Sequence, residues 1–360
     1  MSNRPPGTVT GEGQIHRRGR RHRSRWWGAG VATLGLLAAA CGSSGSTPAA
    51  SSSGSSSSSS GGSSSGGSAS GGGSIAKNVS LKGAKFKVAS LNFTEMYVLG
   101  NIAADALKAA GANVSTQLGL AGVNTPRQAM LAGKVNLEWN YTSTGWTVFL
   151  KKTSTFKSPE KLYDEVAKAD LAKNHIKWFA KAPLNDTYGI GVNQAWSKKT
   201  GVTTVPELVK LIKSNPSEAT FCTESDFRIR PDGLPLVEKT YGFTYPANLL
   251  HTLTLSLIYP SIAKGSTCHF GEIYTTAPQL TSDNLVVLKD PKSAFLVYNP
   301  AVNVPVSIYK KYPQLSKLFG PISAKLTTSV ITHLNYEVDI KGESAATVAA
   351  NWLKKEGFTA

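Results

Sequence analysis

Cysteine is scarce in this sequence and histidine is scattered, which argues against a bound metal. The three cysteines are Cys41, Cys222 and Cys268, and no two of them form a C-x-x-C pair. Of the six histidines, His16 and His22 lie close to the N-terminus, and none combines with cysteine at the spacing of a zinc site. We therefore expect no metal ion and no cofactor.

Catalytic motifs are missing as well. No Walker loop, nucleophile elbow or dinucleotide-binding G-x-G-x-x-G follows a predicted strand. A catalytic triad whose residues come together only on folding shows no sequence motif. An enzyme therefore remains an alternative, which measurable turnover of a candidate ligand would support. The sequence favours a protein that is not an enzyme.

Acidic residues are outnumbered, but the excess of positive charge is not gathered into one binding surface. The net charge is +17, and residues 1–41, with seven arginines and one glutamate, contribute +6 of it. The other +11 is spread along the chain without a dense basic run. Scattered lysines on a solvated surface explain this pattern, so we expect no nucleic-acid partner.

The N-terminal apolar run is too short for a comfortable membrane span. Residues 28–40 are rich in Ala, Leu and Gly, and they follow a strongly basic segment at 17–25. Small residues then lead to Cys41, an order typical of a secretion signal over residues 1–40. The run LAAAC at 37–41 resembles a bacterial lipobox, although its Leu lies four residues before Cys41 rather than three. The alternatives are an ordinary signal with an incidental cysteine and, because of the arginine pairs, twin-arginine export.

Residues 42–74 are almost entirely Ser and Gly, a composition that cannot bury apolar surface. We interpret residues 41–83 as a flexible linker between a lipid on Cys41 and a folded domain. A low-complexity insert without a role is the other interpretation.

The remaining chain alternates strand and helix patterns, which favours an α/β fold. Short apolar runs predict strands at 85–90, 135–139, 219–222 and 285–288. Helical patterns cover 94–110 and 344–356, and a capping box formed by Thr204 and Glu207 opens a helix that runs to residue 212.

Seven short motifs in this part resemble, in order and spacing, those of the quaternary-amine binding proteins of ABC transporters, whose ligands include glycine betaine, carnitine and choline. They are SLNFTE at 90–95, NYTSTG at 140–145, NDTY at 185–188, RPDGLP at 230–235, EKTYGF at 238–243, IYTT at 273–276 and LNYEV at 334–338. The resemblance implies a periplasmic-binding-protein fold of type II, with the ligand in a cleft between two lobes. The first lobe would comprise residues 84–185 and 290–360, and the second residues 186–289.

The resemblance also implies an aromatic cage for a quaternary ammonium group, built from Tyr141, Tyr188, Tyr274 and Tyr298. A trimethylammonium group has diffuse charge and no hydrogen-bond donor, so aromatic faces attract it through their quadrupoles. Each of these tyrosines could instead be an ordinary core or surface ring.

Polar residues complete the expected site. By the same resemblance Thr144 would add a hydroxyl, and Arg230 would hold a ligand carboxylate, unless it only braces the turn at 231–233. Asn124 lies in a loop where the family varies with its ligand. Asp186 would bring a negative charge near the cleft, or would be a solvated loop residue.

Three residues depart from the family motifs. Leu91 stands where the family has a lysine that helps to bind the carboxylate of betaines, Asn140 replaces a glutamate, and Asp186 replaces an asparagine. These changes favour a cation without a carboxylate.

Export implies an oxidising compartment, and Cys222 and Cys268 fall within one lobe. We expect them to form a disulfide, although two separate buried thiols are the alternative.

These observations predict an extracytoplasmic, monomeric solute-binding lipoprotein. It would be anchored to the outer face of the cell membrane and would deliver a small quaternary amine to an ABC transporter permease. A tethered sensor or adhesion module that binds another small cation is the alternative. Neighbouring permease and ATPase genes would favour the transporter.

Cys41→Ser should release the protein from the membrane fraction, because it removes the acylated thiol. Fractionation, with mass spectrometry of the N-terminal peptide, checks this. Unchanged membrane retention and no lipid on the peptide would contradict it.

Overall fold

A computed structural model describes residues 73–156 and 158–360. The predicted signal, Cys41 and most of the predicted linker lie outside these residues. Within them, no helix is long and apolar enough to cross a membrane.

The packed chain begins earlier than residue 84. Helix α1, Ser74–Asn78, buries Ile75, and Val79 and Leu81 are also buried. The backbone N–H of Ser74 donates to the carbonyl of Gly357 at 2.9 Å, which joins α1 to the C-terminal end of the chain. The linker interpretation of residues 74–83 was therefore wrong. These three apolar side chains directly follow the Ser/Gly run in the sequence, and they pack into the first lobe.

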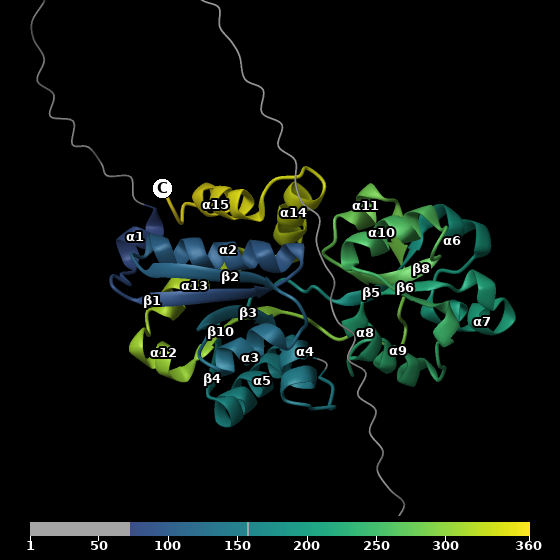
Figure 1. The fold of residues 1–360 in the computed structure, drawn as a ribbon, viewed down its shortest axis with the longest axis horizontal. Coiled ribbons are helices and arrows are strands. Elements are labelled where there is room, and N and C mark those ends of the chain that lie inside the picture. The colour runs from purple at the N-terminus through teal and green to yellow at the C-terminus, as the bar shows by residue number, and fades with distance from the viewer. Residues whose placement is uncertain (1–72, 157) are drawn as a thin grey trace, which may run out of the picture. The chain divides into compact units, whose positions relative to one another are not determined.

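The first lobe is built on a five-stranded mixed sheet of order β2-β1-β3-β10-β4 (Figure 1). Strand β1 pairs in parallel with β2 and β3, whereas β10 is antiparallel to β3 and β4. The strands are β1 Lys85–Leu91, β2 Asn113–Leu120, β3 Leu137–Tyr141, β4 Ile176–Phe179 and β10 Pro300–Pro305.

Helices cover both faces of this sheet, and alternate residues of β1 enter two different cores. Phe86 and Val88 join a core with helices from the C-terminal part, and Ala89 joins a core on the other face. The first core takes side chains of α2 Thr94–Ala109, α13 Leu315–Lys325, α14 Thr328–Asp339 and α15 Ala345–Lys355. The second takes side chains of α3 Thr125–Leu131 and α5 Pro159–Asn174.

The second lobe has its own five-stranded mixed sheet, of order β7-β6-β8-β5-β9. Its strands are β5 Tyr188–Asn193, β6 Phe221–Thr223, β7 Leu250–Thr252, β8 Phe270–Tyr274 and β9 Leu285–Val287. Helix α10, Leu255–Lys264, packs against one face, and α7 Val205–Ser214 and α9 Leu234–Tyr241 contribute to the core on the other. The predicted α/β fold with two lobes is confirmed.

Shorter helices connect these elements. They are α4 Thr142–Thr144, the π-helix η1 Gly145–Phe149, α6 Gln194–Thr200, η2 Pro216–Glu218, α8 Ser225–Ile229, η3 Ala247–Leu249, α11 Gln279–Ser282 and α12 Val306–Lys311. The capping box predicted from Thr204 and Glu207 is present at the start of α7.

Two segments, residues 180–187 and 288–299, connect the lobes and lie side by side. The backbone N–H of Asp186 donates to the carbonyl of Tyr298 at 3.1 Å. In return, the N–H of Tyr298 donates to the side-chain oxygen of Asn185 at 2.7 Å. The amide nitrogen of Asn299 donates to the carbonyl of Leu184 at 2.6 Å. These bonds hold residues of the two connections together at the lobe boundary.

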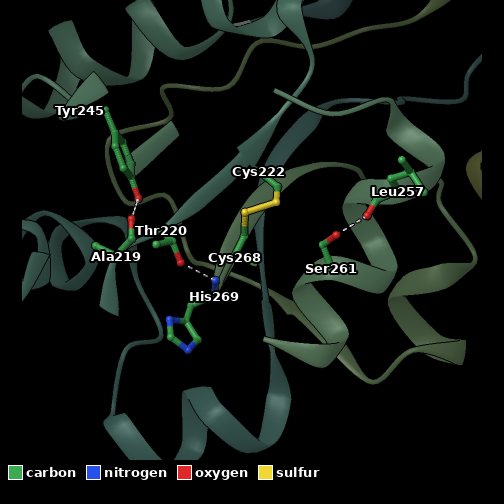
Figure 2. The surroundings of a disulfide bond; sticks show 8 residues. All are labelled: Ala219, Thr220, Cys222, Tyr245, Leu257, Ser261, Cys268 and His269. Atoms are coloured by element: carbon green, nitrogen blue, oxygen red, sulfur yellow. Dashed lines mark hydrogen bonds between the residues drawn. A yellow bond between two sulfur atoms is a disulfide. The ribbon is translucent and has the colours of Figure 1, made fainter. Parts of the chain in front are cut away.

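Cys222 and Cys268 form a disulfide that is buried in the second lobe (Figure 2). Cys222 belongs to β6, and Cys268 lies two residues before β8, the parallel neighbour of β6. The bond therefore reinforces the centre of the second sheet.

A buried charge network lies beside the first sheet. Arg127 of α3 has its Nη1 3.0 Å from Oδ2 of Asp170 and its Nε 3.6 Å from Oε1 of Glu138, and all three side chains are almost fully buried. Burial raises the pKa of Glu138 from 4.5 to about 7, although Arg127 and Asn140 lower it in part. Glu138 therefore keeps its proton over a wider pH range in the folded chain than in the unfolded chain.

Glu138→Gln should flatten the dependence of stability on pH. Because the folded-state pKa is the higher one, the contribution of Glu138 is fully present below pH 4.5 and is lost as the pH rises through about 7. The free energy of unfolding of the native protein should then fall by up to about 1.4 kcal/mol per pH unit more steeply than that of the variant. Urea titrations across this range measure both slopes. Glu343→Gln, which removes an exposed carboxylate, is the control, and equal slopes for Glu138→Gln and the native protein would contradict the prediction.

Candidate functional site

A cavity of about 410 Å³ is lined by residues of both lobes. Seven of the eight predicted ligand residues line it: Tyr141, Thr144, Asp186, Tyr188, Arg230, Tyr274 and Tyr298. The eighth, Asn124, does not. The part of this loop that lines the cavity ends at Val123. Asn124 is exposed and is the N-cap residue of α3, and its carbonyl accepts the N–H of Gln128.

The four tyrosines come from strand ends and from one connection between the lobes. Tyr141 is the last residue of β3, and Tyr188, the first residue of β5, pairs in register with Tyr274, the last residue of β8. Tyr298 lies in the second connection, beside Asp186. Strand pairing and the paired connections thus bring together four residues that are far apart in sequence.

The four rings and Phe93 form a closed cycle of aromatic contacts. From Phe93 the ring centroids are 6.4 Å to Tyr141, then 6.2 Å to Tyr298, 5.3 Å to Tyr188, 5.2 Å to Tyr274 and 5.3 Å back to Phe93. All five residues line the cavity. We call this set the aromatic ring. Sequence reasoning did not assign Phe93 to the site, although it stands inside the SLNFTE motif.

A pair of buried carboxyl groups lies behind the aromatic ring. The hydroxyl of Tyr141 donates to Oε1 of Glu95 at 2.6 Å, and the hydroxyl of Thr276 is 2.8 Å from Oε2 of Glu95 and 2.7 Å from Oδ1 of Asp186. One hydroxyl proton can serve only one of these oxygens, so the arrangement is complete when one carboxyl carries a proton. Burial raises the pKa of Glu95, and burial together with the charge of Glu95 raises the pKa of Asp186 well above its usual range. Burial therefore favours a protonated carboxyl within this pair, and Asp186 is buried rather than solvated.

Most of the hydrogen-bonding capacity of Arg230 is satisfied within the protein. Its guanidinium donates to both oxygens of Asp232, at 2.6 and 2.9 Å, to the hydroxyl of Tyr188 at 2.8 Å and to that of Thr144 at 3.0 Å. Asp232 also accepts from the hydroxyl of Tyr298 at 2.8 Å. Burial opposes ionisation of Asp232, but the charge of Arg230 and these hydrogen bonds bring its pKa below the ordinary value. A guanidinium has five N–H donors, so one remains for a ligand.

The ionisable side chains that line the cavity, apart from tyrosines, are mostly acidic. Asp186, Glu224 and Asp226 contribute carboxyl groups, and Arg230 is the only base among the described residues of the lining. Leu91 lines the cavity where the family motif has a lysine. Sequence reasoning had not assigned Glu224 or Asp226, because neither belongs to a quoted motif. The cavity is therefore suited to a cation.

No group of three or more His, Cys, Asp or Glu side chains that could hold a metal ion is found in the part of the chain that the structure describes. The cavity presents aromatic faces, hydroxyls and carboxyl groups.

Comparison with known proteins agrees with this geometry. Residues 84–355 match the family described as the substrate-binding domain of ABC-type glycine betaine transport systems. The chain is 29% identical over 280 residues to the glycine betaine-binding protein YehZ of Escherichia coli, which covers 76% of this chain and 91% of the relative. It is 26% identical over 275 residues to the carnitine transport binding protein OpuCC of Listeria monocytogenes, covering 76% of this chain and 87% of the relative.

The solved structure of apo YehZ from Escherichia coli superposes with a TM-score of 0.56 at 27% identity. It covers 77% of this chain and 99% of the solved one. The family predicted from the motifs is thus confirmed, and the chain belongs to the substrate-binding domains of ABC-type glycine betaine transport systems.

Proposed function

We propose that this protein captures a quaternary ammonium solute outside the cytoplasm, within its aromatic ring, and delivers it unchanged to the permease of an ABC importer. A lipid on Cys41 holds it to the outer face of the cell membrane. The observation that carries the proposal is the closed cycle of Phe93, Tyr141, Tyr298, Tyr188 and Tyr274 lining one cavity.

The physical basis is the match between a diffuse cation and aromatic faces. A trimethylammonium group offers no N–H, so carboxylates gain little from it, whereas several rings stabilise it while they exclude water. The carboxyl groups of Glu95 and Asp186 support the same ligand, since a cation in the aromatic ring would stabilise their ionised forms.

The polar lining selects against a ligand that carries a carboxylate. YehZ and OpuCC are named for glycine betaine and carnitine, which combine a quaternary ammonium group with a carboxylate. Here the family's lysine is Leu91, and Arg230 is already paired with Asp232. Choline-like cations have no carboxylate, so the missing lysine and the paired Arg230 do not weaken their binding. We propose that the protein binds them more tightly than betaines.

Replacing any one tyrosine of the aromatic ring with Ala should weaken binding of a quaternary ammonium ligand. Each cation–π contact contributes on the order of 0.5–2 kcal/mol, or about 2- to 30-fold in Kd. Tyr274→Phe should be mild, because its hydroxyl makes only a 3.3 Å contact with Glu224. Calorimetry on choline measures the changes, with Tyr336→Ala, a change at an exposed tyrosine of α14, as the control. Choline binding that survives loss of two ring tyrosines would refute the aromatic ring as the site.

Leu91→Lys should shift the preference toward glycine betaine. The new ammonium group can form a charge-assisted hydrogen bond with the ligand carboxylate, worth roughly 1.5–3 kcal/mol, so glycine betaine should bind about ten-fold tighter or more. Choline should gain nothing. Calorimetry with both ligands on the native protein and the variant decides this, and Leu91→Met tests the change of shape without charge. Tight betaine binding by the native protein, unimproved by Lys, would show that Leu91 does not set the preference.

A further inference from the structure

The cavity lining beyond the aromatic ring is rich in hydrogen-bond acceptors. It includes the carboxylates of Glu224 and Asp226, at the start of α8, and the hydroxyls of Thr252 and Thr254, at the end of β7 and just before α10. The cavity volume of about 410 Å³ lies within the usual range of ligand pockets, and a trimethylammonium group with a short tail fills only part of it. A larger ligand would reach these acceptors with the end that lies outside the aromatic ring.

We propose that the natural ligand is an elongated cation whose second end carries an amine or a similar hydrogen-bond donor. The carboxyl groups of Glu224 and Asp226 accept hydrogen bonds from this second end. This inference rests on the proposed function, because it places the quaternary ammonium end in the aromatic ring. The second end of the ligand is assigned to the class of hydrogen-bond donors.

Glu224 places a carboxyl group next to the aromatic ring. Its Oε2 lies 3.3 Å from the hydroxyl of Tyr274, one of the five rings. Its backbone N–H donates to Oε2 of Glu272 at 2.8 Å, and Glu272 is fully buried. Burial and the charge of Glu224 raise the pKa of Glu272 to about 8, and burial raises the pKa of Glu224 as well. A cationic group of the ligand beside Glu224 would favour its ionised form.

Asp226 supplies a second acceptor, and it is fixed from the other lobe. Its Oδ2 accepts the backbone N–H of Val123 at 2.9 Å, across the cavity from one lobe to the other. The other oxygen, Oδ1, has no hydrogen bond to any residue in the described part of the chain. One oxygen is thereby anchored while the second can accept a donor from the ligand.

Two nearby arginines do not make the surroundings of Glu224 and Asp226 favourable to an anion. Arg230 is ion-paired with Asp232, which leaves it one donor. Arg228 contacts Thr252 at 3.4 Å but does not itself line the cavity. An anionic tail would therefore meet two carboxylates with little compensation, and a tail that donates hydrogen bonds would satisfy both.

Three quaternary ammonium probes with tails of similar length separate the possibilities. These are (aminobutyl)trimethylammonium, with a cationic tail, pentyltrimethylammonium, with a neutral tail, and trimethylammoniobutyrate, with an anionic tail. Calorimetry at neutral pH on the full exported protein should give the amine probe a Kd at least about ten-fold lower than the pentyl probe. The butyrate probe should bind most weakly of the three.

Variants then test which residues hold the tail. Glu224→Gln and Asp226→Asn keep an acceptor for Tyr274 and for Val123 but remove the carboxylate, so each should weaken the amine probe more than the pentyl probe and reduce the amine-to-pentyl preference several-fold. A general folding defect would weaken both probes equally. Glu160→Gln, which removes a carboxylate that is 71% exposed on α5, is the control for overall charge.

The outcomes distinguish this inference from the proposed function. If none of the three probes binds, the proposed function fails. If the pentyl or butyrate probe binds at least as tightly as the amine probe, the proposed function stands and the inference is overturned. A preference for the amine that neither variant reduces also overturns it, because Glu224 and Asp226 then do not hold the tail.

Discussion

The pairing of the two connections between the lobes is the constraint on which the site depends. The hydrogen bond from Asp186 to the carbonyl of Tyr298, with the bonds from Asn299 and to Asn185, joins segments more than a hundred residues apart. Tyr188 follows directly on one segment, and Tyr298 lies in the other. The aromatic ring and the carboxyl pair both depend on this pairing. Each is built from residues of different lobes or of a connection between them.

Desolvation then governs the chemistry of the site. Closely packed rings exclude water, which strengthens the attraction of the rings for a cation and also makes isolated carboxylates costly. The protein meets that cost in two ways. Asp232 is neutralised by Arg230, whereas Glu95 and Asp186 have raised pKa values and are bridged by the hydroxyl of Thr276. The same burial is therefore offset by an ion pair at one position and by a shift toward the neutral acid at the other.

Much of this could be predicted from the sequence, because it depends on local patterns and motif spacing. Alternating apolar residues indicated β1 and β3, and the capping box of Thr204 and Glu207 marked the start of α7. Three of the four tyrosines, Tyr141, Tyr188 and Tyr274, lie within the quoted motifs. Glu224 and Asp226 could not be found this way, since what brings them to the cavity is the tertiary position of α8. Asn124 does not line the cavity although its loop does, because membership of a loop does not fix which of its residues reach a cavity. The start of the packed chain was missed because three apolar residues followed a long Ser/Gly run.

The contact between α1 and the C-terminal end of the chain has a mechanical consequence. Ser74 and Ile75 donate to the carbonyls of Gly357 and Phe358, so the described chain both begins and ends on the first lobe. If Cys41 carries a lipid, the tether would therefore reach the chain at the first lobe, and the second lobe would be linked to it covalently by the two connections only. A pull along such a tether would enter the chain at α1, at the far end of the first lobe's sequence from both connections.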